Sequence, residues 1–143
     1  MRAVWYEHTG PAREVLQFGE RPLPEPAPGE VRVRLLASGV NPADIYRRAG
    51  TNWANEFPLI IPNSDGAGVV EAVGAGVDAA LLGQRVWLYN AQRGRPFGTA
   101  AEFTCVPVEY VSALPDDVSF EVGACLGIPC MTCLLYTSDA ADE

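Results

Sequence analysis

Alternating hydrophobic and polar residues dominate the first part of the chain and predict short β-strands. The clearest run extends from Glu30 to Ser38, where charged and apolar side chains alternate as far as Leu35. Such alternation is typical of an antiparallel strand with one face in the core and the other in water. Similar runs bounded by Gly and Pro predict further strands at residues 2–7, 15–20, 68–73, 85–90, 100–106 and 110–113.

Proline and capping residues mark where this strand pattern stops. Residues 21–29 contain four prolines, and because proline removes a hydrogen-bond donor and fixes φ, we expect an extended surface connector there. Asn41 is an N-cap residue type, proline follows it, and Gly50 completes the pattern. A short helix is therefore expected over residues 42–48, since proline favours the first helical position and glycine the position after the end.

A second helix is expected further along the chain. Ser119 or Asp117 can cap it, Glu121 falls in its first turn, and an apolar run over residues 122–131 continues from it. Many short strands with few helices then predict a mainly β, α+β domain that forms a small irregular barrel.

One glycine-rich segment matches the pattern of a dinucleotide-binding loop. Residues 74–79 read G-x-G-x-x-A after an expected strand. A genuine loop of this kind must open a helix before the next strand begins. The strand expected at 85–90 follows too soon for that helix, so we interpret the segment as a β-turn.

The last eleven residues do not resemble natural protein sequence. Residues 133–143, CLLYTSDAADE, are what the transposase adapter used in short-read DNA libraries encodes. Such scars are set aside when a fold is inferred. We therefore expect one incomplete domain over residues 1–132, followed by an adapter-derived segment.

Composition excludes several classes of partner. The chain has 18 acidic residues against 10 basic ones, all arginine, and a net charge of −8. Three of the acidic residues lie in 133–143, and the remainder is still acidic, which argues against nucleic acid and anionic membrane surfaces. No secretory signal opens the chain, and its apolar runs are shorter than the ~18 residues of a membrane helix. We expect a cytoplasmic protein.

Two segments carry a resemblance to a known family: residues 39–50, GVNPADIYRRAG, and residues 62–74, PNSDGAGVVEAVG. Together they resemble the catalytic domain of the medium-chain dehydrogenase/reductases, on the quinone oxidoreductase (zeta-crystallin-like) branch. The resemblance extends over residues 1–132. It implies a GroES-like barrel that stops before the Rossmann domain of full-length relatives, NADPH as cofactor, and a homodimeric parent protein.

The same resemblance argues against a metal. Zinc alcohol dehydrogenases of this superfamily carry cysteine where this chain has Asn41, and histidine where it has Ser64. A catalytic zinc needs three protein ligands and an open position. Cys125 falls near the third ligand position and Asp65 can coordinate, but one thiol and one carboxylate do not complete a site. The four-cysteine lobe that holds the structural zinc in relatives is also missing, so we expect no metal.

The cysteines contain a misleading pattern. Cys125, Cys130 and Cys133 follow C-x4-C-x2-C, the opening spacing of a plant-type iron–sulfur site. The pattern disappears when Cys133 is set aside with the adapter-like segment. Cys105, Cys125 and Cys130 are then expected to be small buried hydrophobic residues.

The resemblance implies four candidate site residues. The Asn41 amide would lie near the nicotinamide and bind the cofactor or a substrate carbonyl, and Tyr46 would contact the nicotinamide half of NADPH. Trp53 would form a wall of the substrate cleft, and Thr132 would lie near the cofactor. Simpler roles remain open: Asn41 can be only a helix cap, and Tyr46 a half-buried residue on an amphipathic helix.

These features predict part of an NADPH-dependent, zinc-independent quinone oxidoreductase. With no metal and no paired acid and base, NADPH would supply the chemistry and the protein the positioning. An enone or alkenal reductase of the same superfamily is the alternative within this class. An inactive GroES-like barrel with no catalysis of its own is the alternative from a different class.

Overall fold

The computed structural model describes residues 1–51 and 56–139. Each predicted strand is present, with ends that shift by a few residues, and the turn before the second strand also contains a short helix. In chain order, with η for a 3-10 helix, the elements are β1 (Arg2–Trp5), α1 (Ala12–Val15), β2 (Gln17–Glu20), β3 (Glu30–Gly39), α2 (Pro42–Ala49), β4 (Asp65–Val73), η1 (Ala79–Leu81), β5 (Arg85–Leu88), β6 (Phe103–Pro107), η2 (Val108–Tyr110), β7 (Val111–Ala113), α3 (Phe120–Gly123) and α4 (Ile128–Asp139).

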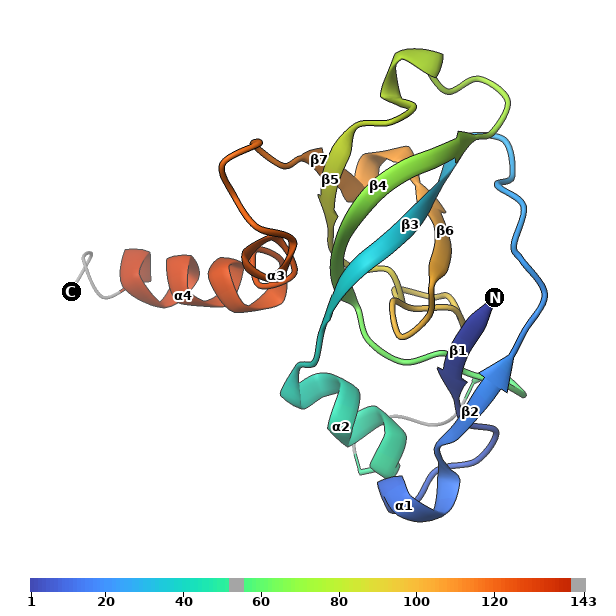
Figure 1. Ribbon diagram of the computed structural model, residues 1–143. Helices are drawn as coiled ribbons and strands as arrows, with labels where there is room; N and C mark the ends of the chain where they lie inside the picture. Colours follow the sequence, from blue (N-terminus) through green and yellow to red (C-terminus); the bar gives the residue numbers. More distant parts are fainter. Residues whose placement is uncertain (52–55, 140–143) are drawn as a thin grey trace.

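Five strands form one antiparallel sheet in the order β6-β3-β4-β5-β7. The sheet curls around its core, as the bent strands in Figure 1 show. The register of β3 against β4 shifts twice, after Arg32 and after Leu35, and such bulges bend a strand and increase its twist. The mainly β, α+β class and the irregular barrel expected from the sequence are confirmed.

The inner face of this sheet holds the main core. Val31 and Val33 are fully buried, whereas Arg34 is exposed, so the alternation seen in the sequence separates core from water. The partners of these valines come from β4, β5 and β6 and the loop after β5: Val70, Val86, Leu88, Ala91 and Val106.

The centre of the sheet leaves no room for a side chain at Gly68 of β4. A Cβ atom there would lie 2.0 Å from the carbonyl oxygen of Arg34, so the two backbones can approach only because Gly68 is glycine.

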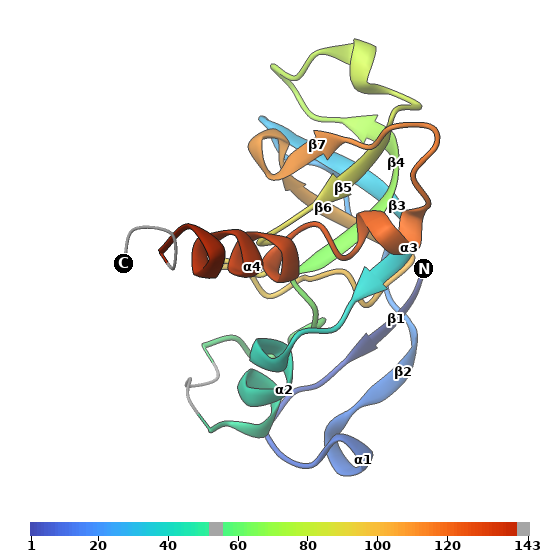
Figure 2. The same ribbon diagram turned by 90° about the vertical axis from the view of Figure 1, so that its left-hand side faces the viewer.

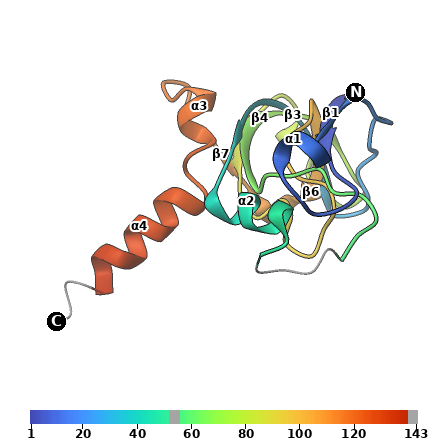
Figure 3. The same cartoon turned by 90° about the horizontal axis from the view of Figure 1, so that it is seen from below.

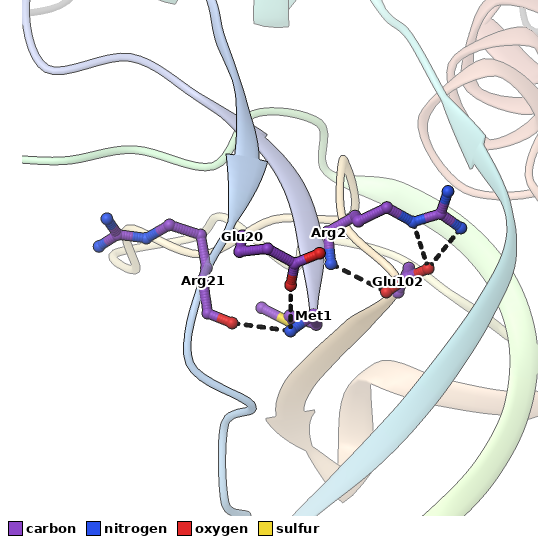
Figure 4. Close-up of polar contacts among 5 residues, drawn as sticks. All are labelled: Met1, Arg2, Glu20, Arg21 and Glu102. Atoms are coloured by element: carbon purple, nitrogen blue, oxygen red, sulfur yellow. Dashed lines mark hydrogen bonds and ion pairs between the residues drawn. The ribbon is translucent and has the colours of Figure 1, made fainter.

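The small sheet of β1 and β2 lies below the larger sheet, together with α1 and α2 (Figure 2). Polar contacts join its strands to each other and to the segment before β6 (Figure 4). The Met1 ammonium donates to the carbonyl oxygen of Arg21 at 2.8 Å and pairs with Glu20 at 3.3 Å. Arg2 donates to Glu102 through its backbone N–H and its Nε, each at 2.8 Å. These contacts join the two-stranded sheet to the segment before β6 at the surface of the domain.

The helix predicted at residues 42–48 is present as α2. Asn41 is its N-cap with φ −109° and ψ 157°, and Gly50 ends it in the left-handed conformation with φ 77°. Because the cap at Asn41 and the stop at Gly50 are local signals, the sequence was sufficient to predict where the helix begins and ends.

The second helix differs from the prediction. The expected continuous run from residue 120 is interrupted, since α3 ends at Gly123 and turns occupy residues 124–127 before α4 begins at Ile128. Figures 1 and 3 show α4 projecting away from the barrel. The helix described as α4 therefore includes part of the adapter-like segment, and its residues 129–137 are exposed.

Candidate functional site

The site begins at the N-terminus of α2, where the chain leaves the end of β3. Asn41 is only 4% exposed. Its backbone N–H donates to Oδ2 of Asp44 at 2.8 Å, and its side-chain Nδ2 donates to Oδ2 of Asp65 at 2.8 Å. Asn41 is therefore both a helix N-cap and a member of a buried polar cluster.

Asp65, the first residue of β4, is the centre of this cluster and was missed as a site residue. It is fully buried, and its Oδ2 also accepts the backbone N–H of Ile128 at 2.9 Å. Burial raises the pKa of Asp65, while the hydrogen bonds from Asn41 and Ile128 oppose that rise. The available signal was a carboxylate at the start of a strand whose first six residues are otherwise apolar or glycine.

Asp44 is a second buried carboxylate beside the first. Burial raises its pKa, and the negative charge of Asp65 raises it further, whereas the N–H groups of Asn41 and Ser64 lower it. Two buried carboxylates with raised pKa values give this corner of the domain an unusual electrostatic environment for a helix start.

A chain of hydroxyl and amide groups supports the backbone of Asp65. Oγ1 of Thr99 donates to the Asp65 carbonyl oxygen at 2.6 Å and lies 2.8 Å from Oγ of Ser38. A threonine hydroxyl has one proton, so Ser38 is the donor in that pair. Ser38 in turn accepts from Nδ2 of Asn63 at 2.9 Å. This series of hydrogen bonds holds the ends of β3 and β4 in place.

The predicted residue Tyr46 lies on α2 but is not part of this cluster. Its side chain is 48% exposed, as is that of the neighbouring Ile45, and Val40 is 68% exposed. No hydrogen bond links the Tyr46 phenol to Asn41 within the described part of the chain. The structure thus gives Asn41 a buried environment and leaves Tyr46 with an open apolar surface around it.

The other two predicted residues are Trp53 and Thr132. Trp53 falls outside the described residues. Thr132 is exposed on α4, one turn beyond Ile128, and its connection to Asn41 runs through the hydrogen bonds that Asp65 makes to both elements.

The residues at the zinc positions of relatives do not fit a metal site. Asn41 uses its amide to bind Asp65, and Cys125 is exposed. In residues 1–51 and 56–139, no three His, Cys, Asp or Glu side chains are placed to share a metal ion. The donors present at this corner are better suited to hydrogen bonding than to coordination.

The prediction for the cysteines was right for one residue and wrong for two. Cys105 is buried in β6, and burial raises the pKa of its thiol to about 11. Cys125 and Cys130 are exposed, because the described chain covers neither of them: the turn before α4 buries Ala124 instead of Cys125, and α4 projects from the barrel.

Residues 74–79 form a turn, as predicted. The N–H of Val77 donates to the carbonyl oxygen of Gly74 at 3.2 Å, and Gly76 has a φ of 81°. The 3-10 helix η1 and β5 follow directly, so no helix opens here to receive a pyrophosphate. The part of the chain that the structure describes also has no helix long and apolar enough to cross a membrane.

Comparison with known proteins places these features in a family. Residues 27–116 match the family described as the alcohol dehydrogenase GroES-like domain. Rat quinone oxidoreductase is 37% identical over 136 residues, which is 92% of this chain and 39% of that protein.

Two solved structures share the architecture. The human synaptic vesicle membrane protein VAT-1 homolog-like protein has a TM-score of 0.85 at 32% identity, over 100% of this chain and 44% of that chain. Escherichia coli quinone oxidoreductase complexed with NADPH has a TM-score of 0.73 at 28% identity, over 87% of this chain and 36% of that chain.

The chain thus spans well under half the length of these relatives. Its fold, its family match and the identity of its relatives agree. The chain belongs to the alcohol dehydrogenase GroES-like domain family, as an N-terminal domain on the quinone oxidoreductase branch of the medium-chain dehydrogenase/reductases.

Proposed function

We propose that this domain belongs to a longer, zinc-independent enzyme that reduces quinones with NADPH. The observation that carries the proposal is the buried amide of Asn41, which stands at the position of a cysteine ligand in zinc-dependent relatives and is held there by Asp65. Relatives named quinone oxidoreductase, one of them complexed with NADPH, support the substrate and cofactor classes.

Asn41 would bind the reactants by hydrogen bonding and Tyr46 by packing of its ring. An asparagine amide offers two donors and one acceptor, and Asp65 uses one of the donors of Asn41. The second amide N–H would bind the nicotinamide or a quinone carbonyl, while the half-exposed ring of Tyr46 would pack against one of them. Trp53 would line the substrate side, and Thr132 would contact the cofactor from α4.

A quinone suits a site without metal or acid–base pair. When bound, NADPH supplies the reducing equivalents, and a quinone is itself a good electron acceptor. The protein then needs mainly to hold the two reactants in contact, and positioning alone accounts for much of the rate in reactions of this kind.

Assays on the full-length protein test this proposal. The reading frame should be followed past the codon of Thr132 in the source DNA, and the complete protein expressed and purified. We expect NADPH oxidation with para-benzoquinone that survives dialysis against a zinc chelator.

Three results would contradict the proposal. They are reduction of cyclohexenone but not of the quinone, loss of activity with the chelator, and a stop codon directly after Thr132. The first would identify an enone reductase, and the last would leave a GroES-like barrel without catalysis of its own.

A further inference from the structure

We infer that Asp65 is the positioning residue of the candidate site, because one carboxylate oxygen sets both the orientation of the Asn41 amide and the start of α4. Its importance for catalysis rests on the proposed function, whereas the contacts themselves do not. The inference follows from three features: the two hydrogen bonds, the absence of space around the carboxylate, and the independent support of the Asp65 backbone.

The direction of the Asn41 amide is set by its hydrogen bond to Asp65. The amide nitrogen and the N–H of Ile128 both donate to Oδ2 of Asp65, at 2.8 Å and 2.9 Å. An ionised carboxylate only accepts hydrogen bonds, so the amide must present its nitrogen to Asp65. The amide oxygen of Asn41 then points away from Asp65, and the side chain cannot exchange its two ends without losing a buried hydrogen bond.

The same oxygen fixes where α4 begins. The first N–H groups of a helix have no partner within the helix, and Ile128 is the first residue of α4. Asp65, far away in the sequence, supplies that partner, and its negative charge is favourable at a helix N-terminus. Because α4 projects from the barrel (Figures 1 and 3), this contact helps to determine where Thr132 lies relative to Asn41.

Gly127 confines the carboxylate on its other side. A Cβ atom at residue 127 would lie 2.3 Å from Oδ1 of Asp65. Oδ1 is buried and has no hydrogen-bond partner in the described chain. The carboxylate is thus enclosed by the turn before α4, and a side chain at residue 127 would displace it.

The backbone of Asp65 does not depend on these contacts. Its carbonyl oxygen accepts from Thr99, and the residue pairs with Gly39 in the β3–β4 ladder. Removing the carboxylate should therefore release Asn41 and α4 while β4 stays in place. If the carboxylate only stabilised the fold, its removal would instead loosen the whole of β4.

Nuclear magnetic resonance on the complete 143-residue chain tests the inference. The measured quantities are the hydrogen-exchange rates of the Ile128 backbone N–H and of the Asn41 side-chain NH2, compared with amides of β4. In Asp65→Leu, which lacks the acceptors at similar size, we expect both rates to rise about tenfold or more beyond the change in β4. In Asp65→Asn, which keeps one oxygen, we expect both rates to stay close to wild type.

Asp44→Asn is the matched control, because the Asp44 carboxylate is also buried but accepts from the Asn41 backbone N–H and, within the described residues, makes no hydrogen bond with Ile128. It should leave the exchange rate of Ile128 unchanged. If Asp65→Leu does not fold, Gly127→Ala is the alternative test. It keeps Asp65 but crowds Oδ1, and it should raise the exchange rates of the Ile128 N–H and the Asn41 NH2.

Equal exchange in the folded Asp65→Leu variant and wild type would overturn the inference, as would an Asp65→Asn variant that loses both protections. If Gly127→Ala decides instead, wild-type rates for both groups would overturn it. These measurements involve no cofactor or quinone, so their failure is separable from failure of the proposed function.

Discussion

Asp44 and Asp65 place two acidic side chains in a nearly water-free corner of a small domain. Each is less than a tenth exposed, and burial disfavours the charged form of a carboxylate. The hydrogen bonds that Asn41 and Ile128 donate to Asp65 reduce this cost without removing it. The protonation state of Asp65 therefore affects both the stability of the domain and the geometry of the candidate site.

The pH dependence of stability should reveal this cost. The pKa of Asp65 is raised above its ordinary value of 3.8, so between the two values the folded state binds more protons than the unfolded chain. Stability contributed by the protonated form is present below the ordinary value and is lost as pH rises through the folded pKa. Asp65→Asn does not titrate, so urea unfolding across this range should show its stability rising relative to wild type. Parallel pH profiles would contradict the assignment.

Gly68 provides a test of the backbone contact between β3 and β4. Gly68→Ala would place a methyl group against the Arg34 carbonyl oxygen, and forced overpacking of this kind costs about 1–3 kcal/mol or more. Gly19→Ala is the control, because its nearest neighbour is the side chain of Trp5 at 3.3 Å, which can move. Urea unfolding should show a clear loss for the first variant and a small change for the second. Equal effects would mean that the sheet tolerates separation of the strands.

The sequence was informative about Asn41 and not about Asp65. Asn41 belongs to a local motif with proline and glycine at fixed spacing, and such motifs can be recognised within one turn of chain. The role of Asp65 depends on Ile128, which the fold brings to it from a distant part of the chain. Tyr46 was chosen from the resemblance, and its role in the site remains a proposal.

At the level of elements, α2 and the strands were predictable because their signals are local. Alternation in β3 and the caps of α2 needed no knowledge of the rest of the fold. The break between α3 and α4 was missed although it has a local signal, because Pro129 fits only the first turn of a helix and a continuous helix cannot pass through it. The contact between Gly127 and Asp65 lies at the same break, and only the fold reveals that contact.

The outer part of α4 should contribute little to stability. Leu134, Leu135 and Tyr136 are each more than 60% exposed, and buried contacts, not helical propensity, stabilise most short helices in proteins. Ending the chain after Thr132 should therefore change the free energy of unfolding by less than about 0.5 kcal/mol, the usual range for surface changes. Urea unfolding of the two chains measures this. A loss of several kcal/mol would mean that residues 133–143 are an integral part of the domain.

At the scale of the whole molecule, the proposed function requires the domain to form one wall of a binding site. Apolar side chains remain exposed around α2 and α3, among them Val40, Ile45 and Val122. Exposed apolar patches commonly mark surfaces that another domain or ligand covers. The pyrophosphate-binding loop that a dinucleotide needs is not formed by residues 74–79.

The 143-residue chain should consequently bind NADPH weakly. In the proposed function Asn41 and Tyr46 contact the nicotinamide half, and we expect most of the binding energy for the rest of the dinucleotide to come from a second domain of the parent protein. Fluorescence or calorimetric titration of the purified chain measures this affinity. A Kd near 1 µM, about −8 kcal/mol, would contradict the proposal that a second domain supplies most of the binding energy.

We propose that the Asn41 amide, held by Asp65, serves the reaction where zinc-dependent relatives use a metal ligand. The most direct test is kcat/KM for para-benzoquinone with NADPH in the full-length protein, comparing Asn41→Ala with wild type. Loss of one positioned hydrogen-bonding group at a reacting centre costs about tenfold to a thousandfold, and we predict a decrease in that range in a variant that still folds, with the loss of stability of about 0.5–2 kcal/mol that removal of an N-cap brings. An Asn41→Ala enzyme with wild-type kcat/KM would show that this amide is only a helix cap.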